Sequence, residues 1–153
     1  MGVENNLQVN THDIKLRAMQ SEDQAELAQL YLTTRKNHFS WVDNPKLSDF
    51  DYATTGEHVQ VAVIQNEIVG FASLSEWDSF LHLLFVKTNW QNNGVGKALL
   101  NWARTSSHLP LELKVVQANQ AARRFYDREG FKVIAYANYA NPTNVTYRDD
   151  RKS

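Results

Sequence analysis

The sequence lacks cysteine and contains only 3 prolines and 6 glycines among its 153 residues. Without cysteine the chain has no disulfide, no thiolate nucleophile and no cysteine ligand for zinc. It also lacks an apolar run near the roughly 18 residues that span a bilayer, and its first ten residues lack the basic and apolar regions of a leader peptide. These absences predict a cytoplasmic protein with no membrane partner.

An excess of charge of either sign is missing too. Lys and Arg number 16 against 17 Asp and Glu, which gives a formal net charge of -1. Proteins that contact phosphate backbones usually carry a basic surplus, so a nucleic-acid function would rest on Lys87, Lys97 and Arg104 alone. We therefore expect no nucleic-acid partner. Hydrophobic residues (42%) and charged residues (22%) lie near globular averages and predict one domain over residues 1–153.

The hydrophobic pattern predicts an α/β (mixed α+β) domain. A first strand and helix occupy 13–36, with a capping-box spacing from Ser21 to Gln24, and 37–57 is interpreted as a surface flap with a short helix near 47–55. The later predicted elements are strands at 58–65, 68–76, 80–88, 110–116 and 131–139, helices at 94–106 and 119–130, and an edge strand in the tail at 144–150. This order predicts a central, mostly antiparallel sheet of six or seven strands flanked by about four helices.

The loop at 91–96, Gln-Asn-Asn-Gly-Val-Gly, follows an apolar strand and leads into a helix. Its glycines and the free N–H groups of a helix N-terminus favour an anion such as pyrophosphate. The loop is not a Walker A motif, because Ala98 follows Lys97 where Ser or Thr should hold a metal, and two glycines are too few for a dinucleotide fingerprint. A plain helix cap without a ligand is the alternative.

A second pattern makes the sequence resemble a known family, the GCN5-related N-acetyltransferases (GNAT family). The residues that carry the resemblance are Leu84-Phe85-Val86, the loop at 91–96, Asn119, Ala121-Ala122, Phe125-Tyr126 and Gly130-Phe131. The match is strong over the core at 58–135 and looser over the first strand and helix, and it leaves a short C-terminal strand and tail at 136–153. The resemblance implies a sheet split at a bulged fourth strand and a transferase that uses acetyl-CoA without a metal.

The resemblance also implies which residues bind the cofactor. The strand edge would pair with the pantetheine arm, the glycine loop would hold the pyrophosphate, and the asparagine would touch the cofactor, although it is equally suited to cap a helix. These cofactor-binding residues are Leu84, Phe85, Val86, Gln91, Asn92, Asn93, Gly94, Val95, Gly96, Lys97 and Asn119. Tyr126 takes the position of the acid that faces the departing thiol; the alternative is a core aromatic.

The general base is less well defined, because Lys114 stands where one branch of the family has a glutamate. The best single candidate is His82, since an imidazole with an ordinary pKa near 6.5 accepts a proton close to neutrality. Glu76, Asp78 and Glu112 are further candidates. A lone histidine in an apolar strand is also often a hydrogen-bonded structural residue, so that interpretation stays open.

The expected reaction is direct acetyl transfer to a primary amine of a small molecule or peptide. An aromatic face at Trp41 and the carboxylates of Glu76 and Asp78 would suit a cationic amine. A non-catalytic acyl-CoA-binding or sensor module on the same fold is the alternative function. Exposed sheet edges make a homodimer a further expectation.

Overall fold

The computed structural model describes residues 13–150, so the N-terminal segment in which we find no leader signal lies outside the described residues. The strands are β1 (Lys15–Ala18), β2 (His58–Ile64), β3 (Glu67–Ser75), β4 (Phe80–Val86), β5 (Glu112–Val116), β6 (Lys132–Ala137) and β7 (Asn144–Arg148). The α-helices are α2 (Gln24–His38), α3 (Asp49–Thr54), α4 (Val95–Ser106) and α5 (Gln120–Arg128), with short 3-10 turns η1 (Ser21–Asp23) and η2 (Thr88–Trp90). The predicted elements are all present, with bounds that differ by a few residues.

The strands form one sheet in the order β1-β2-β3-β4-β5-β7-β6. Every neighbouring pair is antiparallel except β4 and β5, which are parallel. The predicted mixed, mostly antiparallel sheet is therefore confirmed. The expectation of an edge strand in the tail is wrong, because β7 lies between β5 and β6 and pairs with both. Its Val145 and Tyr147 are fully buried in the core.

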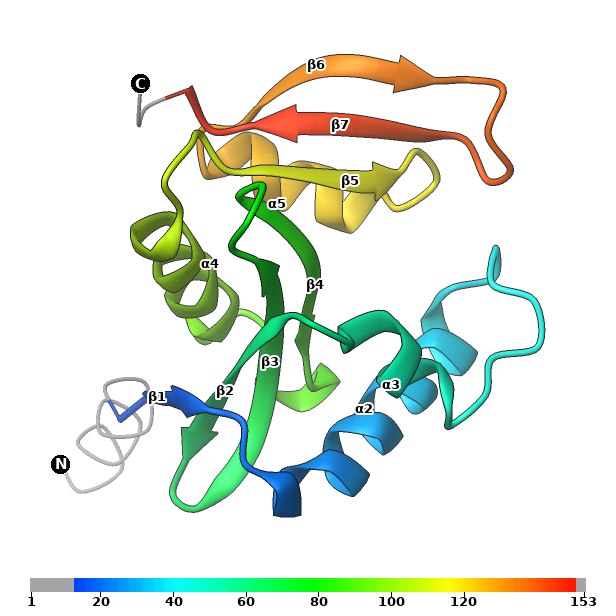
Figure 1. Cartoon of the computed structure of the whole chain (residues 1–153). Coiled ribbons are helices and arrows are strands. Elements are labelled where there is room, and N and C mark those ends of the chain that lie inside the picture. The colour runs from blue at the N-terminus through cyan, green and yellow to red at the C-terminus, as the bar shows by residue number, and fades with distance from the viewer. Residues whose placement is uncertain (1–12, 151–153) are drawn as a thin grey trace, which may run out of the picture.

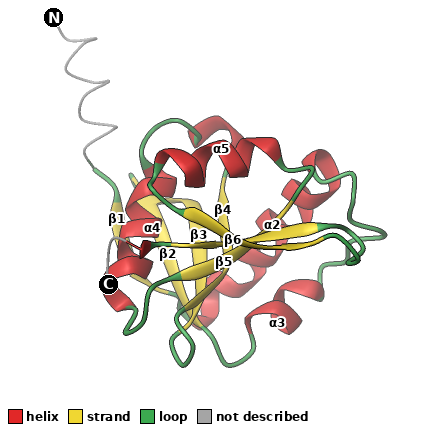
Figure 2. Cartoon of the chain, turned by 90° about the horizontal axis from the view of Figure 1, so that it is seen from above, coloured by secondary structure: helices red, strands yellow, loops and turns green. Residues whose placement is uncertain are grey.

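The sheet is split between β4 and β5. These strands pair only at Phe80 with Glu112 and at Leu81 with Leu113, and beyond that point they diverge (Figure 1). Seen from above, β5 and β6 run across the direction of β4 (Figure 2). The predicted bulge is present in β4, where the register with β3 shifts and leaves His82 as the extra residue.

The two faces of the sheet carry separate apolar cores. Helices α4 and α5 pack on one face, and α2 and α3 pack on the other (Figure 1). The apolar run of β4 is only partly covered, since Leu81 and Phe85 are buried and its other residues are half-buried or exposed. The reason is that beyond Leu81 β4 has a neighbouring strand, β3, on one side only and borders the split on the other. Its apolar side chains are therefore available to line a cleft.

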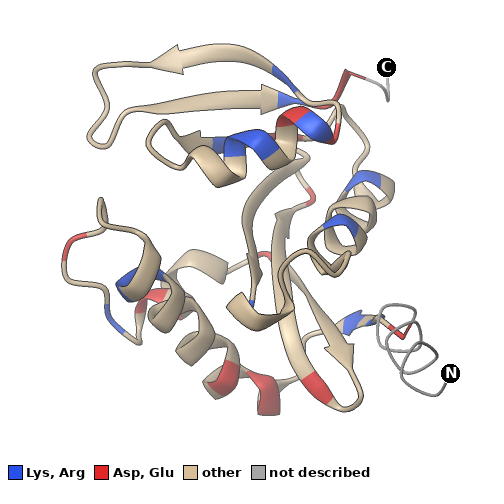
Figure 3. Ribbon diagram, turned by 180° about the vertical axis from the view of Figure 1, so that it is seen from behind, with Lys and Arg blue, Asp and Glu red and all other residues tan. Residues whose placement is uncertain are grey.

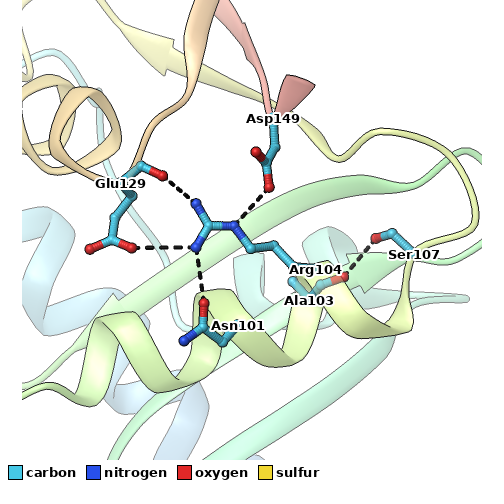
Figure 4. A network of polar contacts seen from close by, with 6 residues as sticks. All are labelled: Asn101, Ala103, Arg104, Ser107, Glu129 and Asp149. Atoms are coloured by element: carbon cyan, nitrogen blue, oxygen red, sulfur yellow. Dashed lines mark hydrogen bonds and ion pairs between the residues drawn. The ribbon is translucent and has the colours of Figure 1, made fainter. Parts of the chain in front are cut away.

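A polar network fixes α4 relative to α5 and the end of β7 (Figure 4). Arg104, in the last turn of α4, donates from Nε to Asp149 Oδ2 at 2.8 Å and from Nη2 to the backbone oxygen of Glu129 at 2.5 Å. Its Nη1 also contacts Asn101 Oδ1 at 2.9 Å. A half-buried, multiply hydrogen-bonded guanidinium holds its neighbours rigidly. The network therefore holds the end of α4 against the end of α5 and the residue that follows β7.

Two of the cations considered for nucleic-acid binding are engaged within the chain. Arg104 belongs to the network above, and Lys87 Nζ lies 3.5 Å from Glu67 and 3.8 Å from Glu26.

Across residues 13–150 no helix is both long and apolar enough to cross a membrane. The outer strands of the sheet are β1 and β6, and a homodimer formed through such an edge stays a prediction.

Candidate active site

The split between β4 and β5 contains two adjoining cavities, of about 680 Å³ and about 440 Å³. We refer to them as the larger and the smaller cavity. Several residues line both of them: Phe39, Leu84, Phe85, Asn119, Ala122 and Tyr126. The two cavities therefore meet at the point where the strands separate, and a molecule in one can reach a molecule in the other.

The larger cavity is bordered by the glycine loop and the first turn of α4. Gly94 is the N-cap residue, in the left-handed region at φ +85°, and no side chain caps this helix. A Cβ atom at Gly96 would lie 3.5 Å from the Phe125 ring and 3.8 Å from Val86, so the helix start lies close against its neighbours. The first N–H groups of the helix have no intrahelical acceptor. They are available to an anion in this cavity.

Basic side chains reinforce this preference for an anion. Lys97 and Arg128 line the larger cavity, where Glu129 is the only carboxylate among the described lining residues. Figure 3 shows basic residues on α4 and α5 and acidic residues gathered at the start of α2. The positive surface is thus placed beside the cavity even though the whole chain is close to neutral.

Most of the cofactor-binding residues that we expected line the larger cavity. They are Leu84, Phe85, Val86, Gln91, Asn92, Gly94, Gly96, Lys97 and Asn119. Two are not in the lining. The Asn93 side chain donates to the backbone oxygen of Gln91 at 3.0 Å, and the Val95 side chain is buried in the core, where it anchors the helix start.

The edge of β4 that faces β5 is open. From His82 to Val86 this edge has no strand partner among the described residues, because pairing with β5 ends at Leu81. Unpaired backbone N–H and C=O groups of a strand edge bind extended ligands as an added strand would. The open edge runs along the cavities. It can therefore pair with a linear part of a ligand and point backbone N–H groups at the end of that ligand.

Asn119 and Tyr126 lie at the junction of the cavities, on α5. Asn119 caps this helix, since its Oδ1 accepts from the Ala122 N–H at 3.2 Å, which confirms the capping role. Tyr126 is 7% exposed, and its ring packs edge-on against Phe125 and Phe131 at 5.0 and 5.5 Å. The ring therefore belongs to the core, as one of the two interpretations proposed, while the same side chain lines both cavities.

The hydroxyl of Tyr126 is free to act as a donor. Burial raises the pKa of this phenol well above its ordinary value of 10.0. The hydroxyl has no hydrogen-bond partner among residues 13–150 and is not a buried polar atom, so it reaches the surface of the cavities that Tyr126 lines. Tyr126 thus stays protonated throughout the physiological range, with its O–H available to a group at the junction.

His82 lines the smaller cavity and is held by a carboxylate. Its side chain is 47% exposed, and its Nδ1 pairs with Glu57 Oε2. Glu57 is 7% exposed at its side chain, and its other oxygen, Oε1, accepts from the Ser73 hydroxyl at 2.5 Å. We did not single out Glu57 from the sequence. It lies 25 residues before His82, and no periodicity or motif connects the two.

The charged residues that line the smaller cavity are basic. Arg35 reaches it from α2 and Lys114 from β5, and none of its described lining residues is Asp or Glu. Arg35 is fixed by Asp49, at 2.9 Å, and its guanidinium lies 4.4 Å from the Tyr31 ring centroid. Lys114 is exposed and has no ion pair within residues 13–150. The cavity therefore favours a neutral or anionic molecule over a polycation.

The residues expected to bind the amine are only partly brought together. Trp41 lines the smaller cavity and stacks on Phe39, with ring centroids 4.8 Å apart. Glu76 and Asp78 lie in the turn after β3, outside the lining of both cavities, and Glu76 pairs with His58 at 3.3 Å. Glu112, another candidate base, is bound by Arg148 at 2.9 Å and also lies outside the lining.

Comparison with known proteins identifies the family. The family described as "Acetyltransferase (GNAT) domain" matches residues 55–133, about half of the chain, which covers β2 to the start of β6 and with them the glycine loop and α5. The chain belongs to the GNAT acetyltransferase family. Both the resemblance seen in the sequence and the split sheet expected from it are confirmed.

The relatives of this GNAT protein include one curated sequence relative and solved structures that share its fold. The peptidyl-lysine N-acetyltransferase YiaC of Escherichia coli (strain K12) is 37% identical over 68 residues, which are 44% of this chain and 45% of YiaC, so the match spans about half the length of that curated relative. Apo-YjaB from Escherichia coli superposes with a TM-score of 0.72 at 21% identity, over 90% of this chain and 97% of YjaB. YncA from Salmonella typhimurium, solved with acetyl-CoA, gives 0.67 at 19% identity, over 90% and 92%. The two structures establish the fold of the whole GNAT domain.

Proposed function

We propose that this GNAT protein is an acetyl-CoA-dependent N-acetyltransferase that moves an acetyl group directly to a primary amine. The observation that carries the proposal is the junction of two cavities at the β4–β5 split, with Tyr126 and Asn119 lining both. A donor and an acceptor held in adjoining cavities react without a covalent enzyme intermediate, because binding already supplies the proximity.

The larger cavity fits acetyl-CoA in three respects. The uncapped first turn of α4, with Lys97 and Arg128 beside it, suits a pyrophosphate. The open edge of β4 suits the amide-containing pantetheine arm. Tyr126 lines the junction with the smaller cavity, where the thioester would lie. Bound there, acetyl-CoA supplies an activated acetyl group whose carbon forms a bond to the amine nitrogen as its carbon–sulfur bond breaks.

Two side chains, His82 in the smaller cavity and Tyr126 at the junction, would manage the protons of this exchange. His82 Nε2 takes one proton from the amine nitrogen, and the Tyr126 hydroxyl donates one to the departing sulfur. Backbone N–H groups on the open edge of β4 stabilise the negative charge that develops on the carbonyl oxygen. Proton return from His82 to Tyr126 through water restores both groups, and an amide and a free thiol leave the site.

The acceptor proposed for the smaller cavity is an amine on a small molecule or peptide that also carries a carboxylate. Arg35 and Lys114 would attract the carboxylate, and Trp41 would provide an aromatic wall. The basic walls also oppose protonation of the amine, which must be neutral to attack. Glu76 and Asp78 would contact only a substrate that extends beyond the cavity, such as a basic peptide.

The test is an acetylation assay with the full chain. Acetyl-CoA is incubated with paired acceptors, each an amino acid or short peptide and its uncharged amide, and both free thiol and acetylated product are measured. We expect stoichiometric thiol and N-acetyl product, with faster turnover of the carboxylate form. Tight binding of acetyl-CoA without thiol release under any of these conditions would favour the alternative, a non-catalytic acyl-CoA-binding module.

A further inference from the structure

The bulge in β4 decides which way His82 points. In the register with β3, Ser73 pairs with Leu83 and Leu74 pairs with Leu81, so His82 is an extra residue with no partner of its own. Leu83 packs in the core on the α2 face, whereas Leu81 belongs to the core on the α4 face. The bulge therefore places His82 beside the α2 face, where the smaller cavity and Glu57 lie.

Glu57 has a chemical reason to be in this position. Its carboxylate is almost fully buried, and both oxygens have partners, Ser73 Oγ on one and His82 Nδ1 on the other. Ser73 is itself fully buried on β3, so it holds the carboxylate against a fixed part of the sheet. A buried carboxylate needs such donors, because an unpaired buried charge is strongly destabilising.

The pairing also determines which nitrogen of His82 carries the proton. An ionised carboxylate only accepts hydrogen bonds, so the nitrogen that faces it must be the donor. A neutral imidazole has one donor and one acceptor nitrogen. With Nδ1 donating to Glu57, the lone pair resides on Nε2, the nitrogen that has no partner within residues 13–150.

We propose that Glu57 is a positioning residue, which holds His82 in the tautomer whose Nε2 accepts a proton in the smaller cavity. The inference rests on the proposed function for its catalytic consequence, although the tautomer itself can be tested without any reaction. When His82 gains a proton, it gains positive charge beside Arg35 and Lys114, which line the same cavity. Glu57 offsets that repulsion by stabilising the imidazolium.

The experiment compares the wild type with Glu57→Gln. The Gln side chain keeps the size of Glu57, but its amide oxygen can satisfy Ser73 while its NH2 group faces His82 and donates to Nδ1, which moves the ring proton to Nε2. Two readouts are used, 15N NMR of the histidine rings at high pH and steady-state kinetics with acetyl-CoA and the best acceptor. The His58 ring, which pairs with Glu76 outside the cavities, serves as an internal reference in the spectra.

A second variant controls for loss of a carboxylate anywhere in the fold. Glu67→Gln makes the same substitution at a carboxylate that also has two donors, Lys87 Nζ at 3.5 Å and Trp90 Nε1 at 3.2 Å, and that lies outside both cavities. Thermal melting of each variant identifies the fraction that is folded, and rates are expressed per folded protein.

We expect the proton of His82 on Nδ1 in the wild type and on Nε2 in Glu57→Gln, with the His58 signals unchanged. The turnover number should fall by about 10²-fold in Glu57→Gln, with the KM for acetyl-CoA unchanged and Glu67→Gln like the wild type. A wild-type His82 protonated at Nε2, or a folded Glu57→Gln with unaltered turnover, would overturn the inference. If the wild type releases no thiol, the acetylation proposal fails, while the NMR result still decides whether Glu57 sets the tautomer.

Discussion

The two cavities of the cleft are built from different parts of the chain and by different chemistry. The larger cavity uses backbone groups, namely the first turn of α4 and the open edge of β4, and its anion-binding loop is one continuous segment. The smaller cavity uses side chains from α2, the flap, the β4 bulge and β5. If the proposed function holds, the comparison teaches that donor binding depends on main-chain geometry, whereas acceptor choice and proton transfer depend on individual side chains.

The sharpest contrast between the cavities should come from His82→Ala. Removing the proposed base in the smaller cavity should lower turnover by roughly 10²- to 10⁴-fold and abolish the acidic limb of the pH–rate profile. Acetyl-CoA affinity, which depends on the larger cavity, should not change. The matched control is His58→Ala, another carboxylate-paired histidine that lies outside both cavities. Wild-type rates for His82→Ala between pH 6 and 9 would show that His82 is not the base and that a carboxylate or a chain of water molecules accepts the proton instead.

Tyr126→Phe probes the junction of the two cavities. The hydroxyl is needed only as sulfur gains charge, so turnover should fall by about 10²-fold while the KM for acetyl-CoA stays the same. The control is Tyr147→Phe, which removes a hydroxyl that is bonded to Arg123 at 3.3 Å and lies outside the lining of both cavities. A folded Tyr126→Phe protein that acetylates at the wild-type rate would show that the role of Tyr126 is purely structural.

Gly96→Val tests the larger cavity alone. Gly96 lines the larger cavity, and a Cβ atom there would already contact the Phe125 ring at 3.5 Å, so the valine methyls should extend into space proposed for the pyrophosphate. Calorimetry should show acetyl-CoA binding weakened by about tenfold, or ~1.4 kcal/mol. Ala98→Val adds the same branched side chain on the same helix, outside the cavity lining, and should bind normally. Equal affinity in folded Gly96→Val would contradict the assignment of the anion site.

The smallest effect is expected from Lys114→Glu, which reverses one exposed charge in the smaller cavity. Exposed charge pairs contribute roughly 0.2–1 kcal/mol, so the KM for an acceptor with a carboxylate should rise by up to about fivefold, and that for its amide should fall or stay constant. Lys132→Glu on β6 makes the same reversal outside the cavities. An identical response of the two acceptors would mean that Lys114 does not contact the acceptor.

The fold and the larger cavity were largely predictable because their signals are local. A strand, a glycine loop and a helix follow one another from Phe80 to Ser106, and backbone geometry then determines where the free N–H groups point. The interior place of β7 was not predictable, since alternation in a five-residue segment indicates a strand and not its neighbours.

The smaller cavity was only partly predictable because its parts are far apart in the chain. His82 could be proposed from its chemistry, but the pairing with Glu57 depends on a one-residue bulge and on a loop 25 residues earlier. Glu76 and Asp78 were placed near the acceptor because they follow a strand, yet that turn lies outside the cavity lining. Tertiary placement, which no local pattern encodes, decides each of these contacts.

The central claim is that the larger cavity holds the donor and the smaller cavity holds the acceptor. It is tested most directly by mapping backbone amide NMR shifts of the whole chain as coenzyme A and then an acceptor carrying a carboxylate are added. Coenzyme A should shift the amides of 84–86, 91–97 and 119–122, and the acceptor should then shift those near Arg35, Trp41, His82 and Lys114. Coenzyme A shifts centred on the second group, or none in either group at saturating concentration, would contradict the account.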